Sequence, residues 1–443
     1  MMLEVHPLER LIGEARVPGD KSISHRAALL AAVARGTTEI VGFLEAEDCL
    51  ASLGAVRALG AEVMRTATGA YRVTGKGRRG LHEPSNVIDC GNSGTTARLL
   101  LGLLAGQPFW SMLTGDESLR QRPMGRVATP LRTMGATVVG RADSTRLPLA
   151  VRGADCVQAI AYESPVASAQ VKSAILLAGL AAEAPVTVTE PAPSRDHSER
   201  MLRDFGARVD TVGTMVTLTP CELTATRVRV PGDFSSAAFL LAAGLVVPHA
   251  VVTVRRVGVN PTRTGMLDVL GAMGASIAWS DVSEGAEPTA TLTVRAGELR
   301  GTTIDSPLIP RLIDEVPVLA VLAACARGVT EVRGAAELRV KESDRIAAIA
   351  RELGKMGVSV EERPDGFRLE GPQRFSGAHV HSGGDHRMAM ALAVAGLVAD
   401  GPTLIDDAAC IATSFPAFAS TLNALAGREM VHAHTAESDA PDA

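Results

Sequence analysis

Several kinds of residue are scarce in this chain of 443 residues, and each scarcity excludes a class of function. Aromatic residues make up only 3% of the chain, which argues against a surface that binds nucleic acid by stacking on its bases. The formal net charge is −5, so no general basic field exists for DNA, RNA or an anionic membrane. Any anion that the protein binds must therefore be met by local charge.

The six cysteines are scattered and form no C-x-x-C pair. This spacing is typical of reduced thiols in a cytosolic protein, and of neither a disulfide framework nor a zinc site. The N-terminal segment has no apolar run that would make a signal peptide. The longest apolar runs also fall short of the roughly 18–20 residues that a membrane span needs. The sequence therefore predicts a cytoplasmic protein without a membrane partner.

A repeat is what the chain does contain. A phrase of the form large apolar, Gly, small, any residue, β-branched occurs five times, with glycines 68 to 83 residues apart. The copies lie at 59–63, 134–138, 205–209, 273–277 and 356–360, with a degraded sixth at 425–427. Each complete copy follows an amphipathic stretch and precedes a short alternating segment, which predicts a helix closed by a glycine cap and then a β-hairpin.

Six such units predict two domains of three units each, since units near 70 residues are too long for the usual solenoids. The tetrapeptide V-P-G-D at 17–20 recurs at 230–233, each time before an Ala/Leu-rich helix. We therefore expect a first domain at 18–228 and a second made of 1–17 plus 229–430. The acidic end, 431–443, is predicted to be a flexible tail.

Six further stretches are apolar nearly all round, as expected of helices buried inside a domain. A polar cluster precedes each one, and most clusters carry a cation, although the N-terminus of a helix is already positive. These cations are Lys21, Arg26, Arg98, Lys172, Arg311 and Arg387. An anionic ligand would resolve the conflict, because phosphate at a helix N-terminus meets both N–H groups and cations. The alternative is that each is one exposed side chain on a solvated face.

Two further charged clusters lie at 119–126 and 339–345. In the second, helical spacing would place Lys341 and Arg345 on one face, with Glu342 alongside. A charged surface face, or a solvated loop for 119–126, is the plain alternative. No metal or cofactor is implied: there is no H-E-x-x-H motif, and the G-x-G-x-x-G at 75–80 is followed by Leu-His-Glu-Pro instead of an apolar helix.

The polar clusters, in their order along the chain, resemble those of 5-enolpyruvylshikimate-3-phosphate synthase. The motifs are DKSISHR, GNSGTTARLL, RPMGR, SAQVKSAILLAGL, SRDHSE, PRLIDEVP, RVKESDR, DHRMAMA and ATSFP, and the resemblance covers roughly residues 5 to 425. It implies an α/β fold: a two-domain inside-out α/β barrel, each domain made of three βαβαββ units with buried helices. In that family ligands bind in the interdomain cleft, towards which helix N-termini converge.

The resemblance implies transfer of the enolpyruvyl group of phosphoenolpyruvate to the 5-hydroxyl of shikimate 3-phosphate, by addition and elimination through a tetrahedral ketal. Phosphate is released, and the product feeds aromatic amino-acid biosynthesis. Holding two phosphates and two carboxylates close together needs several cations, and proton transfer needs positioned acids and bases. The implied partners are these two small molecules, with no nucleic acid, and the protein is expected to be a monomer.

The resemblance also assigns roles to residues. Asp314 would be the general base, Glu342 a second proton-transfer group, and Lys21 would touch both ligands and could protonate the departing phosphate. The shikimate 3-phosphate positions are Lys21, Ser22, Arg26, Ser168, Ala169, Gln170, Arg195, Asp314 and Lys341. The phosphoenolpyruvate positions are Lys21, Gly94, Arg122, Gln170, Arg345 and Arg387.

Three positions bear on inhibition by glyphosate, and they do not agree. Ala169 stands where many members have a serine, and Thr413 where many have a lysine, and both changes resemble a subgroup that includes insensitive enzymes. Gly94, however, lacks the alanine methyl that crowds the inhibitor in those insensitive members. The sequence leaves sensitivity open, with Gly94 favouring it.

Two rival functions share the scaffold. One is the sister transferase that acts on UDP-N-acetylglucosamine, but that family has an asparagine after its N-terminal lysine, where this chain has Ser22, and a reactive cysteine in a mobile loop, which 119–126 lacks. The other is a non-catalytic phospho-ligand binder, which would be expected to lose Asp314 or Glu342 while keeping the arginines.

Overall fold

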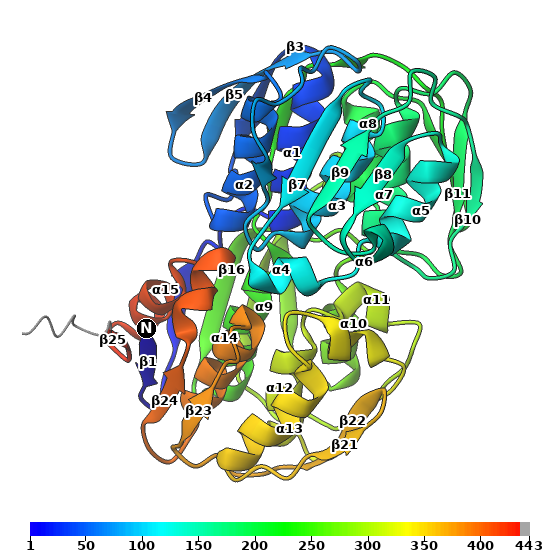
Figure 1. The fold of residues 1–443 in the computed structure, drawn as a ribbon. Helices are drawn as coiled ribbons and strands as arrows, with labels where there is room; N and C mark the ends of the chain where they lie inside the picture. The colour runs from blue at the N-terminus through cyan, green and yellow to red at the C-terminus, as the bar shows by residue number, and fades with distance from the viewer. Residues whose placement is uncertain (435–443) are drawn as a thin grey trace, which may run out of the picture. The chain divides into compact units, whose positions relative to one another are not determined.

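The computed structural model describes residues 1–434, and these form two compact domains (Figure 1). The N-terminal domain holds 18–231 and a three-residue insert, 285–287. The C-terminal domain holds 1–17, 232–284 and, within the described range, 288–434. The first domain thus ends three residues later than the sequence analysis placed it, and the insert was not foreseen. Residues 431–434 were assigned to a flexible tail but form a strand, and 435–443 lie outside the described residues.

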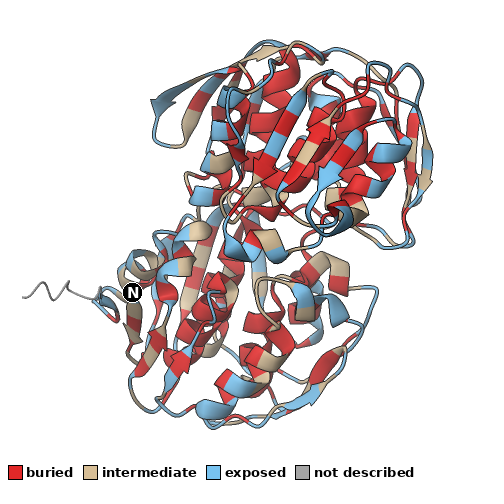
Figure 2. Cartoon of the chain, in the orientation of Figure 1, coloured by how far each residue is buried: buried red, intermediate tan, exposed pale blue. Residues whose placement is uncertain are grey.

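The six apolar stretches form buried helices, as the sequence predicted, and they appear as red ribbon in Figure 2. Those of the N-terminal domain are α1 (Lys21–Val33), α3 (Gly94–Leu104) and α7 (Ala169–Gly179). Those of the C-terminal domain are α9 (Phe234–Val246), α12 (Val316–Cys325) and α14 (His386–Gly396). Helix α3 packs against α1 and α7, and α9, α12 and α14 pack against one another. Each domain therefore has its own hydrophobic core, centred on three helices.

Each domain has three small sheets, and all six follow one pattern: a parallel pair, then two antiparallel pairings. In the first sheet of the N-terminal domain, β14 (Leu223–Thr224) and β15 (Arg227–Arg229) both pair with β3 (Ala34–Val41), which is followed by β5 (Ala70–Lys76) and β4 (Glu62–Ala67). The strand order of the second sheet is β6 (Ile88–Asp89), β7 (Trp110–Thr114), β9 (Leu149–Arg152) and β8 (Thr137–Gly140). That of the third is β10 (Ala161–Glu163), β11 (Val186–Thr189), β13 (Met215–Leu218) and β12 (Val209–Val212).

In the C-terminal domain, the strand order of the first sheet is β2 (Ile12–Ala15), β16 (Val251–Gly258), β18 (Thr289–Arg295) and β17 (Ile277–Ser283). That of the second is β19 (Thr303–Ile304), β20 (Gly328–Val332), β22 (Gly366–Gly371) and β21 (Glu361–Arg363). That of the third is β23 (His379–His381), β24 (Thr403–Asp406), β1 (Met2–Val5) and β25 (Val431–His434). The last sheet joins the two ends of the chain, since β1 pairs with β25, visible in Figure 1 as blue beside red. This pairing, with that of β2 and β16, explains why the first 17 residues belong to the C-terminal domain.

A second helix in each unit ends beside a glycine, and in the five complete copies a β-hairpin follows it, as the repeat predicted; α15 is followed instead by β25, which pairs with β1. These helices are α2 (Glu47–Ala58), α5 (Gly125–Thr133), α8 (His197–Asp204), α10 (Gly265–Ala272), α13 (Arg345–Lys355) and α15 (Phe418–Ala426). After α2, Gly60 has φ +92° and the N–H of Ala61 donates to the Val56 carbonyl, which closes the helix in a Schellman motif. Gly427, in the degraded sixth copy, also has a positive φ and caps α15.

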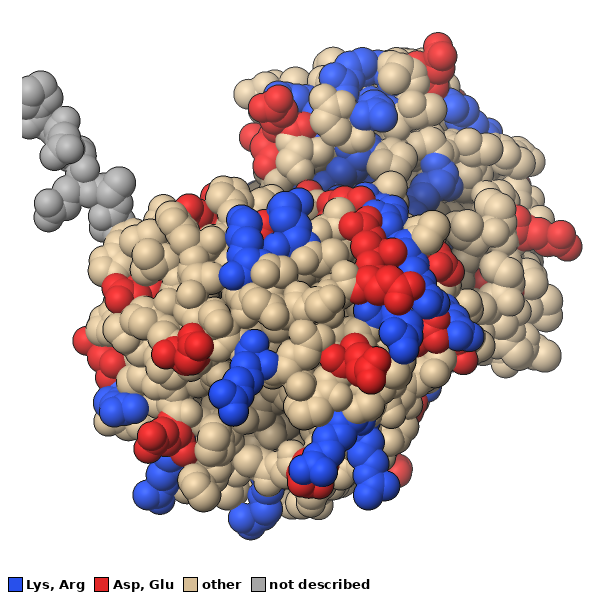
Figure 3. All heavy atoms as spheres, turned by 90° about the horizontal axis from the view of Figure 1, so that it is seen from below, with Lys and Arg blue, Asp and Glu red and all other residues tan. Residues whose placement is uncertain are grey.

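Shorter helical segments complete the chain: α4 (Glu117–Gln121), α6 (Arg141–Ser144), α11 (Ile309–Leu312), and the 3-10 helices η1 (Ala336–Val340) and η2 (Ala408–Thr413). Within residues 1–434, no helix has the length and apolarity to cross a bilayer. On the face shown in Figure 3, acidic and basic side chains lie interspersed, with no single-sign field.

Candidate active site

The residues singled out by the sequence analysis lie at the starts of buried helices and in the loops beside them. Helix α1 begins at Lys21, α3 begins at Gly94, and Ser168 is the N-cap of α7. In the C-terminal domain, Arg345 and Arg387 lie in the first turns of α13 and α14. Because four unpaired N–H groups point out of each helix start, each domain gathers donors and cations where an anion can meet them.

Helix α1 carries two of the predicted cations, and they are held differently. Lys21 forms an ion pair with Asp48 on α2, with 2.5 Å between Nζ and Oδ2. Arg26 is buried and donates to the hydroxyls of Ser198 and Ser173, at 2.7 and 2.8 Å. Burial lowers the pKa of Arg26 to about 10, which leaves its guanidinium charged at neutral pH. Arg26 therefore brings a positive charge into the space between α1, α7 and α8.

The start of α3 lies between two guanidinium groups. A Cβ atom added to Gly94 would lie 3.1 Å from Nη1 of Arg98 and 3.5 Å from Nη1 of Arg122. Arg98 in turn donates to Oε1 of Gln170, at 2.7 Å, and Arg122 to Oδ1 of Asn92, at 2.6 Å. The absence of a side chain at Gly94 thus leaves the backbone open between two cations, an arrangement suited to an anion.

The segment that begins α7 is tied to the loop before α8. The N–H of Ser168 donates to Glu190 at 2.7 Å, and Gln170 donates to the hydroxyl of Thr95 at 3.1 Å. Arg195 lies near Arg26, since its charge is one of the influences that lower the pKa of Arg26. The structure thus brings Arg26, Ser168, Gln170 and Arg195 into one region of the N-terminal domain.

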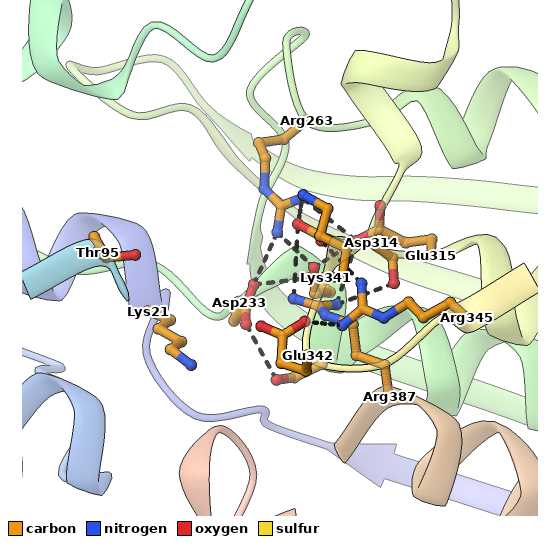
Figure 4. A network of polar contacts seen from close by, with 12 residues as sticks. Lys21, Thr95, Asp233, Arg263, Asp314, Glu315, Lys341, Glu342, Arg345 and Arg387 are labelled. Atoms are coloured by element: carbon orange, nitrogen blue, oxygen red, sulfur yellow. Dashed lines mark hydrogen bonds and ion pairs between the residues drawn. The ribbon is translucent and has the colours of Figure 1, made fainter. Parts of the chain in front are cut away.

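The C-terminal domain holds a dense set of ion pairs around Arg345, whose side chain is fully buried (Figure 4). Its Nε lies 2.7 Å from Oδ2 of Asp385, its Nη2 lies 2.7 Å from Oε2 of Glu342, and its Nη1 lies 3.4 Å from Oδ1 of Asp314. Burial alone would lower the pKa of Arg345, but the charges of Asp385 and Glu342 outweigh it and raise that pKa.

Asp314, the predicted base, has two further arginines beside it. Nη2 of Arg387 lies 3.8 Å and Nη1 of Arg263 lies 3.9 Å from its Oδ2 atom. Its side chain remains 13% exposed, and that of Glu342 28% exposed, so both carboxylates can be reached by a ligand. Three guanidinium groups thus lie within 4.0 Å of the Asp314 carboxylate, whose exposed part can take a proton from a bound hydroxyl.

Three buried residues of this cluster were missed as site residues. Arg263 lies in the loop before α10 and donates to Ser235 at 2.5 Å; Glu315 accepts from Arg263 at 3.4 Å; and Asp385 is both the N-cap of α14 and the main partner of Arg345. The sequence pattern that indicated site cations was their position before buried helices, whereas Arg263 precedes α10, an outer helix. Asp385 contacts Arg345 from 40 positions away in the chain, and nothing in the sequence indicates that contact.

Two cations at helix starts already form ion pairs with acidic side chains of the protein itself. Lys172 lies between two carboxylates, and Nη1 of Arg311 is paired with Asp268 at 2.6 Å. Lys341 is also not on a helix with Arg345: α13 begins only at Arg345, and Lys341 follows η1, with Nζ 3.5 Å from Oε1 of Glu337. For these residues the helix-start and helix-face interpretations are wrong, because local spacing does not determine which acidic side chains pack nearby.

Comparisons with known proteins identify the family. The family described as EPSP synthase (3-phosphoshikimate 1-carboxyvinyltransferase) matches residues 5–422. A 3-phosphoshikimate 1-carboxyvinyltransferase of Desulforudis audaxviator is 54% identical over 96% of this chain and 99% of its own length, and one of Gloeobacter violaceus is 56% identical over 94% and 96%. The solved structure of EPSP synthase from Acinetobacter baumannii has a TM-score of 0.89 and 42% identity, covering 98% of this chain and all of that one.

Proposed function

This chain belongs to the EPSP synthase family, and we propose that it transfers the enolpyruvyl group of phosphoenolpyruvate to the 5-hydroxyl of shikimate 3-phosphate. It is accordingly an enzyme of the shikimate pathway, a 3-phosphoshikimate 1-carboxyvinyltransferase. The observation that carries the proposal is the position of Asp314, a partly exposed carboxylate beside three arginines, where it can take a proton from a bound hydroxyl.

In the addition step, Asp314 takes the proton of the 5-hydroxyl while the oxygen attacks C2 of phosphoenolpyruvate. The C3 methylene gains a proton at the same time, and Glu342 is the group we assign to deliver it. A tetrahedral ketal results, which still carries the phosphate on C2. General acid–base catalysis of this kind contributes about 10²–10⁴-fold to a rate.

In the elimination step, the new methyl group returns a proton to the carboxylate of Glu342 and the bond from C2 to the phosphate oxygen breaks. Lys21 is the cation we assign to the departing phosphate, because its ammonium group begins α1 and has a proton to donate. Arg122, Arg345 and Arg387 would hold the charges of phosphoenolpyruvate, with Gly94 giving its backbone access. Fixed cations lower the barrier by stabilising the negative charge that develops on the leaving group.

For shikimate 3-phosphate we assign Ser22, Arg26, Ser168, Gln170, Arg195 and Lys341. Ala169, next to Ser168, contributes only its backbone. We also propose that the protein acts as a cytoplasmic monomer.

The test is phosphate release from phosphoenolpyruvate with purified protein, comparing shikimate 3-phosphate and UDP-N-acetylglucosamine as acceptors. Release with shikimate 3-phosphate alone is the expected result. Release with UDP-N-acetylglucosamine would instead identify the sister activity. Binding of shikimate 3-phosphate without any release would make the protein a phospho-ligand binder and overturn the mechanism.

A further inference from the structure

A buried group of three charged side chains lies beneath the start of α7. Nζ of Lys172 lies 2.8 Å from Oε2 of Glu190 and 2.7 Å from Oε1 of Glu199, and each of the three side chains is less than 5% exposed. Lys172 comes from α7, Glu199 from α8, and Glu190 from the residue after β11. Burying three charges is costly unless each is paired, so this arrangement calls for an explanation beyond simple packing.

Glu190 reaches two segments that belong to the proposed shikimate 3-phosphate site. Its Oε1 atom accepts the N–H of Ser168 at 2.7 Å, and its Oε2 atom accepts the hydroxyl of Ser194 at 2.7 Å. Ser168 is the N-cap of α7, two residues before Gln170, and Ser194 precedes Arg195. A single carboxylate therefore fixes both segments relative to each other.

Lys172 reduces the electrostatic cost of placing the carboxylate of Glu190 at this position. Two carboxylates beneath a phosphate site would repel the ligand, and the ammonium group, 2.8 Å from Glu190 and 2.7 Å from Glu199, reduces the formal charge of the group to −1. Burial alone would lower the pKa of Lys172, yet Glu199 and Glu190 outweigh burial and raise it. Lys172 consequently stays charged and stays paired with Glu190 beside the two segments that Glu190 holds.

We propose that Glu190, held by Lys172, is a positioning residue for the recognition of shikimate 3-phosphate. It sets the backbone of Ser168 and the hydroxyl of Ser194 so that Gln170 and Arg195 are in place before the ligand arrives. Preorganisation of this kind increases affinity by reducing the ordering that binding requires. The inference rests on the proposed function, because it concerns the acceptor of that reaction.

The C-terminal domain offers a matched control. Glu352 on α13 is also buried and has the same kinds of partner: the N–H of His381 at 2.9 Å, Nζ of Lys355 at 2.8 Å and Nε of Arg351 at 2.6 Å. None of these partners has a role in the proposed function. Removing Glu352 should therefore destabilise the fold without changing recognition of the acceptor.

The experiment compares steady-state kinetics of the wild type, Glu190→Ala, Glu190→Gln and Glu352→Ala. Glu190→Ala is expected to raise the KM for shikimate 3-phosphate about tenfold or more, with kcat within about threefold, because two charge-assisted hydrogen bonds are lost. In Glu190→Gln the amide oxygen can still accept from Ser168, so KM should stay within about threefold of the wild type. Glu352→Ala should lower the melting temperature and leave that KM unchanged.

If Glu190→Ala does not fold, Ser194→Ala removes one of the same hydrogen bonds and should raise the KM about threefold. A folded Glu190→Ala or Ser194→Ala with wild-type KM would overturn the inference and leave the proposed function standing. An increase equal to that of Glu352→Ala would do the same, since it would reduce Glu190 to a structural role. A wild type that neither binds nor uses shikimate 3-phosphate would overturn both.

Discussion

The two domains hold their site arginines in different ways. In the N-terminal domain, Arg26 and Arg122 donate to neutral oxygens of serines and of Asn92. In the C-terminal domain, Arg345 and Arg387 lie against carboxylates, among them Asp314. The hydrogen-bond acceptors of these arginines are neutral in the first domain, whereas in the second domain the groups beside the arginines carry negative charge.

The difference suggests a division of labour. Arginines held by neutral groups keep their full positive charge for an incoming anion, and the neutral partners fix where that charge points. Arginines held by carboxylates have a second task, which is to fix where those carboxylates lie, Asp314 among them. Four variants or pairs of variants test this contrast, from the largest expected effect to the smallest.

The largest effect is expected from Asp314→Asn, which keeps the size of the side chain and removes its ability to accept a proton. Turnover should fall about 10²–10⁴-fold, while shikimate 3-phosphate still binds. Phosphate release and titration calorimetry measure the two quantities. Asp268→Asn is the control, since it removes an exposed carboxylate paired with Arg311 in the same domain. Turnover that survives in Asp314→Asn would show that another group is the base.

The next effect concerns stability and compares Arg345→Met with Arg26→Met. Loss of Arg345 leaves the carboxylates of Asp385, Glu342 and Asp314 without their shared partner, which should lower the free energy of unfolding by about 3–5 kcal/mol. Loss of Arg26 removes hydrogen bonds to neutral oxygens and should cost about 1–3 kcal/mol. Urea denaturation measures both. Equal losses in the free energy of unfolding would contradict the difference between the two domains.

The two domains should also differ in their response to acid. Burial lowers the pKa of His25 from 6.5 to about 3, so between these values the unfolded chain takes up a proton that the folded chain does not. The contribution of His25 to stability is therefore fully present above pH 6.5, and below that pH the free energy of unfolding falls by about 1.4 kcal/mol per pH unit. His25→Asn should flatten this dependence, measured by denaturation between pH 4 and 7.

For Asp385 in the C-terminal domain, burial alone would raise the pKa, but the charge of Arg345 outweighs it and lowers the pKa below 3.8. The stability that Asp385 contributes is present above pH 3.8 and is lost only as the pH falls through its lower folded value. His432→Asn, at a partly exposed histidine, is the control for His25→Asn. An unchanged slope in His25→Asn would show that His25 does not cause the acid dependence.

The smallest effect is expected from Gly94→Ala, whose methyl group would crowd Nη1 of Arg98 at 3.1 Å and touch Nη1 of Arg122 at 3.5 Å, an ordinary contact distance. The KM for phosphoenolpyruvate should rise roughly five- to tenfold, the equivalent of about 1 kcal/mol of crowding. Glyphosate should inhibit the wild type and inhibit Gly94→Ala less. Gly54→Ala is the control, because a Cβ there meets nothing within 4 Å. An unchanged KM would mean that the two guanidinium groups move aside at no cost.

Much of the fold could be predicted because its signals are local. Each of the six buried helices is apolar on nearly every face, and each hairpin follows a glycine that must adopt a positive φ, as Gly60 and Gly357 do. The N-caps Asp20, Ser168 and Asp233 likewise act within three residues of their own position. Signals of this kind survive in any tertiary environment.

Side-chain partners were not predictable in the same way. Arg26 meets Ser198, 172 positions away, and Arg345 meets Asp385, 40 positions away. The sequence indicated that Lys172 lies at the start of a helix, but its partners, Glu190 and Glu199, come from a strand end and another helix. Arg263 gave no local signal, because it acts only once α10 brings its loop beside Glu315.

The sequence by itself determined the six units, their buried helices, the placing of charge at helix starts and the family. Only the tertiary structure decided which charges face each other, that β1 pairs with β25, and that Lys172 forms an ion pair with Glu190 instead of contacting a ligand. The physical reason is range. Helix periodicity, capping and glycine dihedrals act over a few residues, whereas the pairing of buried charges depends on packing that brings together residues far apart in the chain.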